Sequence, residues 1–230
     1  MGCPAADARV TTASSEPGHL PRLDEAVAPR CPSILLASRS PRRRELLTAA
    51  GVPHVAAAPV FDDSALSPGD IRSPSHWVTS LAYLKAWSQA MSHPDASLVL
   101  GSDTACVLDG RLIGTPSDGA EAEGMIRAFM DRRHEVVTGV AIIDRRREGA
   151  RRHLFADEAV VTMGRVPEEE LAAYVASGAW QGKAGGYNLM DRVRAGWPLA
   201  WEGDPTTIMG LPMNRLIGRL NTLLRDAPRA

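Results

Sequence analysis

The sequence predicts an α/β fold organised as one domain. The chain has 230 residues, of which 44% are hydrophobic and 23% are charged, and these values are typical of a globular protein with a sizeable core. From residue 33 onward, short β-like runs alternate with helical runs, which is the pattern of the α/β class. The same stretch contains no internal repeat and no obvious linker. We therefore expect a single domain over residues 33–230.

Residues 1–32 are expected to form a disordered leader outside this domain. They are rich in Ala, Pro, Ser and isolated charges, without any period, and they end in Ala-Pro-Arg-Cys-Pro. Such a composition offers too little apolar surface to offset the entropy lost on ordering.

The domain is expected to begin with a strand followed by a helix. Residues 34–36, Ile-Leu-Leu, are suited to a buried strand. Ser40 is placed as an N-cap, Pro41 fits the first helical position, and Gly51 is the residue type that ends helices.

A second helix and a hairpin are expected next. The helix is predicted over residues 75–91, and a strand over residues 97–108 follows it. The dipeptide Asp109-Gly110 is typical of a hairpin turn, so residues 111–113 should return beside that strand.

The rest of the chain continues the alternation. A helix over residues 121–130 precedes two strands, over 134–143 and 152–163, whose β-branched residues and polar connection predict neighbouring strands. A helix should begin at Pro167 and end at Gly178.

The C-terminal part combines a glycine-rich loop with an amphipathic helix. Residues 182–188, Gly-Lys-Ala-Gly-Gly-Tyr-Asn, are predicted to be irregular, and residues 212–224 carry apolar positions with helical spacing. Irregular loops between ordered elements often carry binding sites.

Charge and cysteine content limit the function classes. A formal net charge of -1 provides no global field for a polyanion, so any phosphate must be bound by local clusters of Arg and Lys. Cys3, Cys31 and Cys106 form no CxxC pair, which favours a reducing cytoplasmic location over disulfide or zinc chemistry. No apolar run approaches the length of a membrane span and no secretory signal is evident, so we expect no membrane partner.

The start of the first predicted helix is a candidate phosphate site. Arg42 and Arg43 lie in the first helical turn, where positive side chains oppose the helix dipole unless an anion binds there. The alternative is a solvated basic face, and the pattern alone does not separate the two.

The end of the strand over residues 97–108 offers a candidate carboxylate. Asp103 follows the apolar run of residues 98–100, and an aspartate in that position can bind Mg²⁺ or orient a water. An ordinary strand-end turn is the commoner explanation for such a string.

Two lysines and an acidic pair complete the candidates. Lys85 on the second helix and Lys183 in the glycine-rich loop would supply point charges for a triphosphate, although most lysines are simply solvated. Asp62 and Asp63 are candidates for a second metal ligand, although turns are the commoner location of such a pair. Neither GxGxxG nor a P-loop occurs.

These motifs occur in an order that resembles the Maf family of nucleoside triphosphate pyrophosphatases, also known for septum formation. The resemblance runs from residue 33 to about residue 224. It rests on Leu-Ala-Ser-Arg-Ser-Pro-Arg-Arg at 36–43, Leu-Ala with Lys-Ala at 81–86, Gly-Ser-Asp-Thr at 101–104, His-Glu-Val with Thr-Gly-Val at 134–140, Lys-Ala-Gly-Gly-Tyr at 183–187 and Gly-Leu-Pro at 210–212.

The resemblance implies an elongated mixed sheet flanked by helices, with two lobes around a central cleft. It implies hydrolysis of a nucleoside triphosphate to a monophosphate and pyrophosphate, with Mg²⁺ or Mn²⁺, commonly in a homodimer. Asp103 and Lys85 match the catalytic residues, and Asp103 and Asp63 match the metal ligands. The expected substrate contacts are Ser38, Ser40, Arg42, Arg43, Thr104, Lys183 and Met190.

The chain departs from the family pattern at three positions. Thr115 replaces a lysine after the hairpin, which would weaken triphosphate binding unless Arg111 or a nearby arginine substitutes. Met190 replaces a glutamine associated with base specificity, and methionine donates no hydrogen bonds. Asp63 stands where the family usually has a glutamate. Arg42 and Thr104 agree with the dTTP/UTP subgroup, so the base preference is expected to be of that type or broad.

Two other functions are weighed against the enzyme. The first is a catalytically weak, nucleotide-binding regulator linked to cell-division arrest, which the threonine at position 115 motivates. The second is a nucleic-acid surface made of Arg39, Arg42–Arg44 and Arg145–Arg147. The neutral charge balance and the lack of interleaved aromatic residues argue against nucleic acid as a partner.

Overall fold

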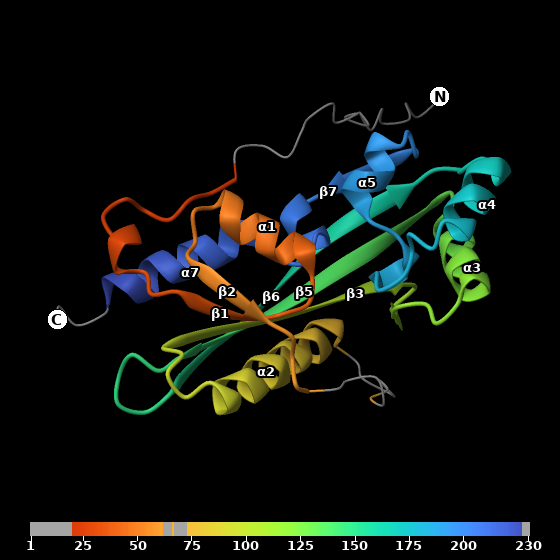
Figure 1. Ribbon diagram of the computed structural model, residues 1–230. Helices are drawn as coiled ribbons and strands as arrows, with labels where there is room; N and C mark the ends of the chain where they lie inside the picture. The colour runs from red at the N-terminus through yellow and green to blue at the C-terminus, as the bar shows by residue number, and fades with distance from the viewer. Residues whose placement is uncertain (1–19, 62–65, 67–72, 227–230) are drawn as a thin grey trace, which may run out of the picture.

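A computed structural model describes residues 20–61, 66 and 73–226 of the chain (Figure 1). Within these residues, seven strands form one mixed sheet with the order β2-β1-β3-β5-β6-β7, and β4 pairs with the far end of β3. The strands are β1 (Ile34–Ala37), β2 (His54–Ala57), β3 (Leu98–Leu108), β4 (Arg111–Ile113), β5 (Arg132–Asp144), β6 (Arg151–Met163) and β7 (Leu199–Glu202). The helices are α1 (Pro41–Ala49), α2 (Pro74–Ser92), α3 (Gly119–Phe129), α4 (Glu168–Ala176), α5 (Leu189–Arg194), α6 (Pro205–Ile208) and α7 (Met213–Arg225), with 3₁₀ turns η1 (Ala28–Arg30) and η2 (Ala184–Gly186).

Three long strands give the molecule its elongated shape. β5 lies between β3 and β6 and runs antiparallel to both, whereas the short β1 and β2 pair in parallel beside the start of β3. This confirms the predicted α/β class and mixed sheet.

The sheet has a gap along one edge of β3. β1 pairs with β3 only as far as Gly101, and β4 pairs with β3 only from Cys106 onward. Residues 102–105 therefore have a strand partner on one side only, where β5 lies. A strand edge without a partner exposes backbone donors and acceptors, and side chains next to it are accessible from both faces of the sheet.

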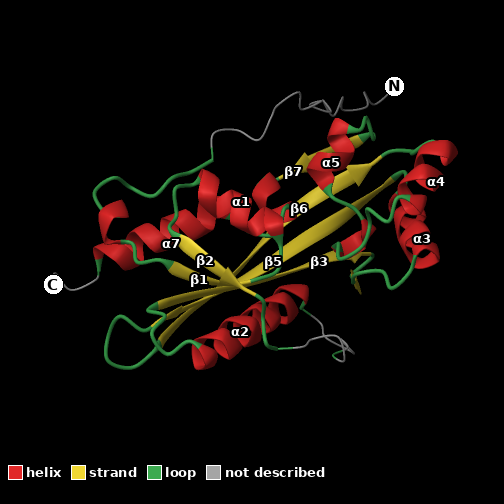
Figure 2. Ribbon diagram, viewed as in Figure 1, coloured by secondary structure: helices red, strands yellow, loops and turns green. Residues whose placement is uncertain are grey.

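Helices cover the two ends of the sheet separately, which creates two lobes (Figure 2). In the first lobe, α1 and α7 pack on one face of β1, β3 and β5 through a cluster that includes Leu36, Leu47 and Leu216. In the second lobe, α3, α4, α5 and the glycine-rich loop pack around the far ends of β5 and β6, with Phe129 and Leu171 at the centre. α2 covers the opposite face of the sheet.

Two glycines bring α2 unusually close to the sheet. A Cβ atom at Gly101 would lie 2.1 Å from the Ala82 carbonyl oxygen, and one at Gly139 would lie 2.4 Å from the Thr79 backbone nitrogen. Only glycine fits at such backbone contacts, so the two positions fix the height of α2 above β3 and β5.

Most predicted elements are present within one or two residues of their expected bounds. Ser40 occupies the N-cap of α1, Pro41 its first turn, and Gly51 follows its end with φ of 70°. The prediction missed β2, α5, α6 and β7, all of six residues or fewer. The glycine-rich loop contains the single turn η2, in which Gly185 has φ of 67°.

The predicted disorder of residues 1–32 is wrong for residues 20–32. Leu23 and Val27 are buried and belong to the same apolar cluster as α7, and the Asp24 backbone N–H donates to Asn221 Oδ1 at 3.0 Å. Leu20, Leu23 and Val27 are spaced so that together they cover apolar surface of the first lobe, which offsets the entropy of ordering this short segment.

Among the described residues, no helix combines the length and hydropathy needed to cross a membrane.

Candidate active site

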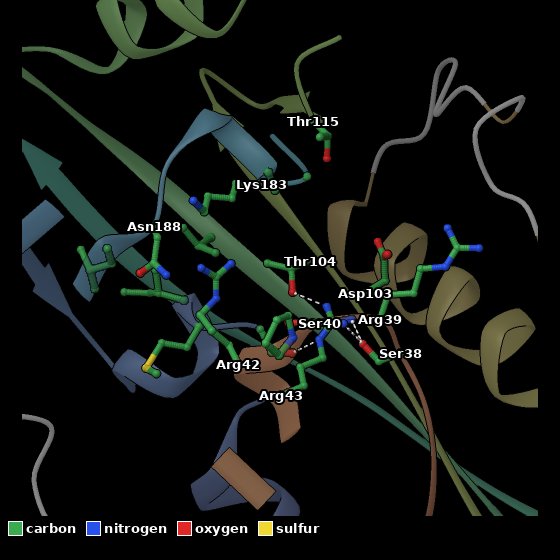
Figure 3. Close-up of a pocket in the computed structure, with 18 of the residues that line it drawn as sticks. Ser38, Arg39, Ser40, Arg42, Arg43, Asp103, Thr104, Thr115, Lys183 and Asn188 are labelled. Atoms are coloured by element: carbon green, nitrogen blue, oxygen red, sulfur yellow. Dashed lines mark hydrogen bonds between the residues drawn. The ribbon is translucent and has the colours of Figure 1, made fainter. Parts of the chain in front are cut away.

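A cavity of about 1120 Å³ lies at the gap in the sheet, between the two lobes. Its walls come from the turn between β1 and α1, from β3, α2 and α5, from the glycine-rich loop and from residues 208–210 (Figure 3). Among the described residues of the lining, the cationic ones are Arg39, Arg42, Arg43, Lys85, Lys183 and Arg194, and the acidic ones are Glu45, Asp103 and Asp191. This excess of cations in the described part of the wall favours a multiply charged anionic ligand.

Asp103 and Lys85 form an ion pair in the cavity wall. Lys85 Nζ donates to Asp103 Oδ1 at 2.6 Å, and both side chains are largely buried, with 14% and 15% of their surface exposed. β3 presents Asp103 on the side of the sheet that α2 covers, and the close approach of α2 at Gly101 and Gly139 brings Lys85 within reach. The other carboxylate oxygen, Oδ2, makes no hydrogen bond within the described part of the chain.

Arg43 is held by three neutral acceptors. Its Nε donates to the Gly210 carbonyl at 2.8 Å, Nη1 donates to Ser38 Oγ at 3.2 Å, and Nη2 donates to Thr104 Oγ1 at 3.2 Å (Figure 3). Gly210 has φ of 97°, and a Cβ there would lie 3.2 Å from Arg43 Nε, so glycine suits both the backbone conformation and the contact.

A directed chain of hydroxyls orients the Thr104 contact. Thr138 Oγ1 donates its single proton to the Thr207 carbonyl at 2.7 Å, so in its 2.9 Å contact with Thr104 Oγ1 it must accept. Thr104 therefore donates to Thr138 and accepts from Arg43. The chain links α1 across β3 and β5 to α6, and its partly buried hydrogen bonds fix the orientation of both threonine hydroxyls.

Burial leaves the cavity cations short of compensating charge. Burial is the largest influence on Arg42, Arg43 and Lys183, and it lowers the pKa of each; Asp191 partly counteracts it at Arg42, and Asp103 at Arg43. None of these three forms an ion pair with a described carboxylate. In contrast, Arg127 and Arg146, which do pair with carboxylates, have raised pKa values. The cavity therefore holds positive charge that an anion would stabilise.

The glycine-rich loop, residues 182–188, holds Lys183 at the cavity wall. Gly185 packs against Cys106 and Phe129 in a conformation with φ of 67°, and its N–H donates to the Gly114 carbonyl at 2.9 Å. Tyr187 anchors the loop through a 2.7 Å hydrogen bond between its hydroxyl and His134 Nε2. Lys183 Nζ donates to the Ala179 carbonyl, so one of its three protons is used inside the loop.

The other predicted contact residues also line the cavity. Ser38 is buried, its Oγ accepts from the Ser40 backbone N–H at 3.1 Å, and the Ser40 side chain makes no capping bond with α1. Met190 is buried in the second lobe and faces the cavity. Asp63 lies outside the described residues.

The cavity lining bears on the expectation that Arg111 or a nearby arginine substitutes for the family lysine at position 115. Thr115 lines the cavity and is exposed, whereas Arg111 does not line it. Arg39 and Arg194 are the additional arginines in the wall, contributed by the β1–α1 turn and by α5.

Sequence reasoning missed Asn188, Asp191 and Arg194 as cavity residues. Asn188 is the N-cap of α5, and Asp191 and Arg194 belong to this helix, which has six residues and is too short to show a helical period. A usable signal was present, since Asn188 is a favourable N-cap residue and accepts from the Asp191 backbone N–H at 3.3 Å.

The donor set suits a metal that also binds substrate. Within residues 20–61, 66 and 73–226, no group of three His, Cys, Asp or Glu side chains is arranged to hold a metal ion. Mg²⁺ is usually held by one or two carboxylates together with phosphate oxygens and water. Asp103, with Oδ2 available beside a cationic cavity, fits a site of that kind.

Comparison with known proteins gives a consistent result. The family model described as Maf-like protein matches residues 33–223. A protein of Symbiobacterium thermophilum named dTTP/UTP pyrophosphatase is 37% identical over 187 residues, which cover 81% of this chain and 92% of the relative. Proteins of the same name from Salinibacter ruber and Bacillus mycoides are each 38% identical over 197 residues, covering 85% and 86% of this chain and 93% and 98% of the relatives.

Proposed function

This chain belongs to the Maf family and is a nucleoside triphosphate pyrophosphatase, and from that premise we propose that dTTP and UTP are its substrates. The products are the nucleoside monophosphate and pyrophosphate. The observation that carries the proposal is the cavity in which Arg42 and Arg43, partly buried and without an ion-pair partner among the described carboxylates, lie beside the Asp103–Lys85 pair.

The cations bind and orient the triphosphate. Arg42 and Arg43 lie in the first turn of α1, where the helix dipole adds to their positive charge and draws the phosphate chain toward the helix start. Arg43 is held by neutral acceptors only, so it keeps its full charge for the ligand. Lys183 and Arg194 approach from the other lobe, so a bound triphosphate bridges both walls of the cavity.

Asp103 activates the water. In this mechanism Asp103 Oδ2 accepts a proton from the water while the water oxygen forms a bond to the α-phosphorus. The bond between the α-phosphorus and the bridging oxygen breaks, and pyrophosphate leaves with that electron pair. Lys85 holds the opposite carboxylate oxygen, which fixes the direction of Oδ2. The arginines stabilise the charge that develops on the phosphates.

We further propose that a divalent cation, Mg²⁺ or Mn²⁺, binds at Asp103 with the substrate. When bound, the cation would neutralise phosphate charge and polarise the phosphorus–oxygen bonds. Asp103 is the described residue that would hold it, and Asp63 is the second ligand that the sequence predicts.

The proposal also covers the domain organisation of the chain, its oligomeric state and its cellular compartment. We infer that residues 33–230 act as one catalytic domain, since both lobes share one sheet and both line the cavity. A homodimer and a cytoplasmic location remain part of the proposal, and the free thiols of Cys31 and Cys106 suit a reducing compartment.

The test is pyrophosphate release from a panel of nucleoside triphosphates. Wild type is expected to release pyrophosphate from dTTP and UTP with Mg²⁺ or Mn²⁺ and to stop when EDTA removes the metal. Asp103→Asn keeps the size of the side chain and removes its basic oxygen, so turnover should fall at least about 10³-fold. If wild type binds nucleotides but releases no more pyrophosphate than the variant, the pyrophosphatase proposal fails and a nucleotide-binding regulator takes its place.

A further inference from the structure

An uncharged amide lines the cavity on the side opposite Asp103. Asn188 precedes α5, and the residue as a whole is 7% exposed. In Figure 3, Asn188 and Asp103 lie on opposite sides of the cavity, with Thr104 and Arg42 between them. A nucleotide whose phosphates lie near Asp103 and the arginines would extend its base toward Asn188.

The hydrogen bonding of Asn188 determines which group it presents. Its Oδ1 accepts from the Asp191 backbone N–H at 3.3 Å, and because a backbone N–H can only donate, the amide oxygen must face the helix. The amide nitrogen Nδ2 then faces away, and it makes no hydrogen bond within the described part of the chain. Although Asn188 as a residue is buried, Nδ2 is not among the fully enclosed polar atoms, so it stays accessible from the cavity, where a ligand oxygen can accept from it.

We propose that Asn188 Nδ2 donates a hydrogen bond to a carbonyl oxygen of the pyrimidine base and thereby distinguishes uracil and thymine from cytosine. This inference rests on the proposed function. Thymine and uracil carry a carbonyl oxygen at position 4, whereas cytosine carries an amino group there, which is itself a donor. A fixed N–H donor therefore forms a hydrogen bond with thymine or uracil, but it has no acceptor to bond when cytosine occupies the site.

Met190 completes this end of the cavity without competing for the base edge. It is buried, lies two residues after Asn188 and faces the same cavity. Its thioether has no donor, but it offers a polarisable apolar surface for the flat ring and for the methyl group of thymine. Base recognition in this chain therefore falls to Asn188 rather than to residue 190.

The test replaces the donor with an acceptor while keeping the helix cap. Asn188→Asp retains an N-cap oxygen of similar reach, but it presents a carboxylate to the base. The ratio of kcat/KM for UTP to that for CTP should fall about 10-fold to 100-fold, since a charge-assisted hydrogen bond forms with the cytosine amino group as the one with uracil is lost. Asn188→Ser also keeps the cap but is too short to reach the base, so the ratio should fall toward one.

Gln181→Glu is the matched control for added charge. Gln181 also lines the cavity, but it is exposed, so the same amide-to-acid change should weaken all nucleotides alike and leave the ratio unchanged. Thermal melting identifies any variant that does not fold. If Asn188→Asp does not fold, the ratio of kcat/KM for UTP to that for CTP in Asn188→Ser tests the inference. An unchanged ratio in a folded Asn188 variant, or an equal shift in the Gln181 control, overturns the inference. If wild type hydrolyses neither UTP nor dTTP, the proposed function fails, and this inference fails with it.

Discussion

Replacing Gly101 by alanine is expected to damage both stability and catalysis, because it separates α2 from the sheet. The new Cβ would lie 2.1 Å from the Ala82 carbonyl oxygen and 2.9 Å from the Ala86 backbone nitrogen. These are backbone atoms, so no side-chain rotation relieves the contact. A relaxed contact between a carbon and an oxygen is about 3.3 Å, so α2 must move by about 1 Å.

The displacement bears directly on the Asp103–Lys85 pair, to which we assign the catalytic role. Lys85 lies on α2 between Ala82 and Ala86, and its Nζ is 2.6 Å from Asp103 Oδ1. Overpacking of this kind costs about 1–3 kcal/mol of unfolding free energy. A misplacement of about 1 Å at a catalytic group lowers the rate by up to about 100-fold, so kcat/KM for UTP should fall by a factor of about 10–100.

The assays are urea unfolding and steady-state kinetics, with Gly124→Ala as control. Gly124 lies in α3, and a Cβ there meets no atom within 4 Å. That change should raise the free energy of unfolding by about 0.5–1 kcal/mol through helix propensity and leave the kinetics unchanged. If Gly101→Ala unfolds at the same urea concentration as wild type and keeps its kcat/KM, the argument that glycine sets the height of α2 is refuted.

Two further predictions concern buried polar groups. Thr138→Val removes the acceptor of Thr104 and the donor to the Thr207 carbonyl, so unfolding free energy should fall by about 1–3 kcal/mol and KM for UTP should rise as Arg43 loses its orientation. The same change at the exposed Thr162 should alter stability by less than about 0.5 kcal/mol, and equal effects at both positions would contradict the hydroxyl chain. Burial lowers the pKa of His134 to about 4 from 6.5, so as pH falls from about 6.5 the unfolded chain takes up a proton that the folded chain does not. Stability should therefore drop by roughly 3 kcal/mol between pH 6.5 and pH 4 from this residue. In urea titrations over that range, His134→Gln should show a shallower loss than wild type, and identical slopes would count against the assignment.

The elements that the sequence predicts are those with strong local signals. The long strands are rich in apolar and β-branched residues, and α1 has Ser40 before it and Gly51 after it. β2 was missed because His54–Ala57 shows no alternation, and its residues are only partly buried or exposed. It is a strand because β1 supplies its hydrogen bonds, which is information from elsewhere in the chain.

The candidate site was predictable in its residues but not in its contacts. Asp103 and Lys85 are 18 positions apart and Arg43 and Gly210 are 167 apart, so no spacing rule brings them together. The ordered motifs supplied the candidates through their resemblance to a family. The motifs do not predict the gap in the sheet at residues 102–105, because it depends on where β1 stops and where β4 starts. Asn188 was overlooked because it ends the stretch predicted to be irregular, and α5 after it is too short to show a helical period.

Under the proposed function, the hydrogen-bond partners of Arg43 leave its positive charge available for a phosphate. A carboxylate beside a buried arginine would stabilise its charge, as Asp144 does for Arg146, and the pair would then have little left to gain from a ligand. Two hydroxyls and a carbonyl fix the direction of the Arg43 guanidinium without neutralising it, and burial then lowers its pKa. In the unliganded protein, the desolvated Arg43 guanidinium therefore destabilises the folded state. A bound triphosphate offsets this desolvation penalty through its negative charge, which increases its affinity for the site.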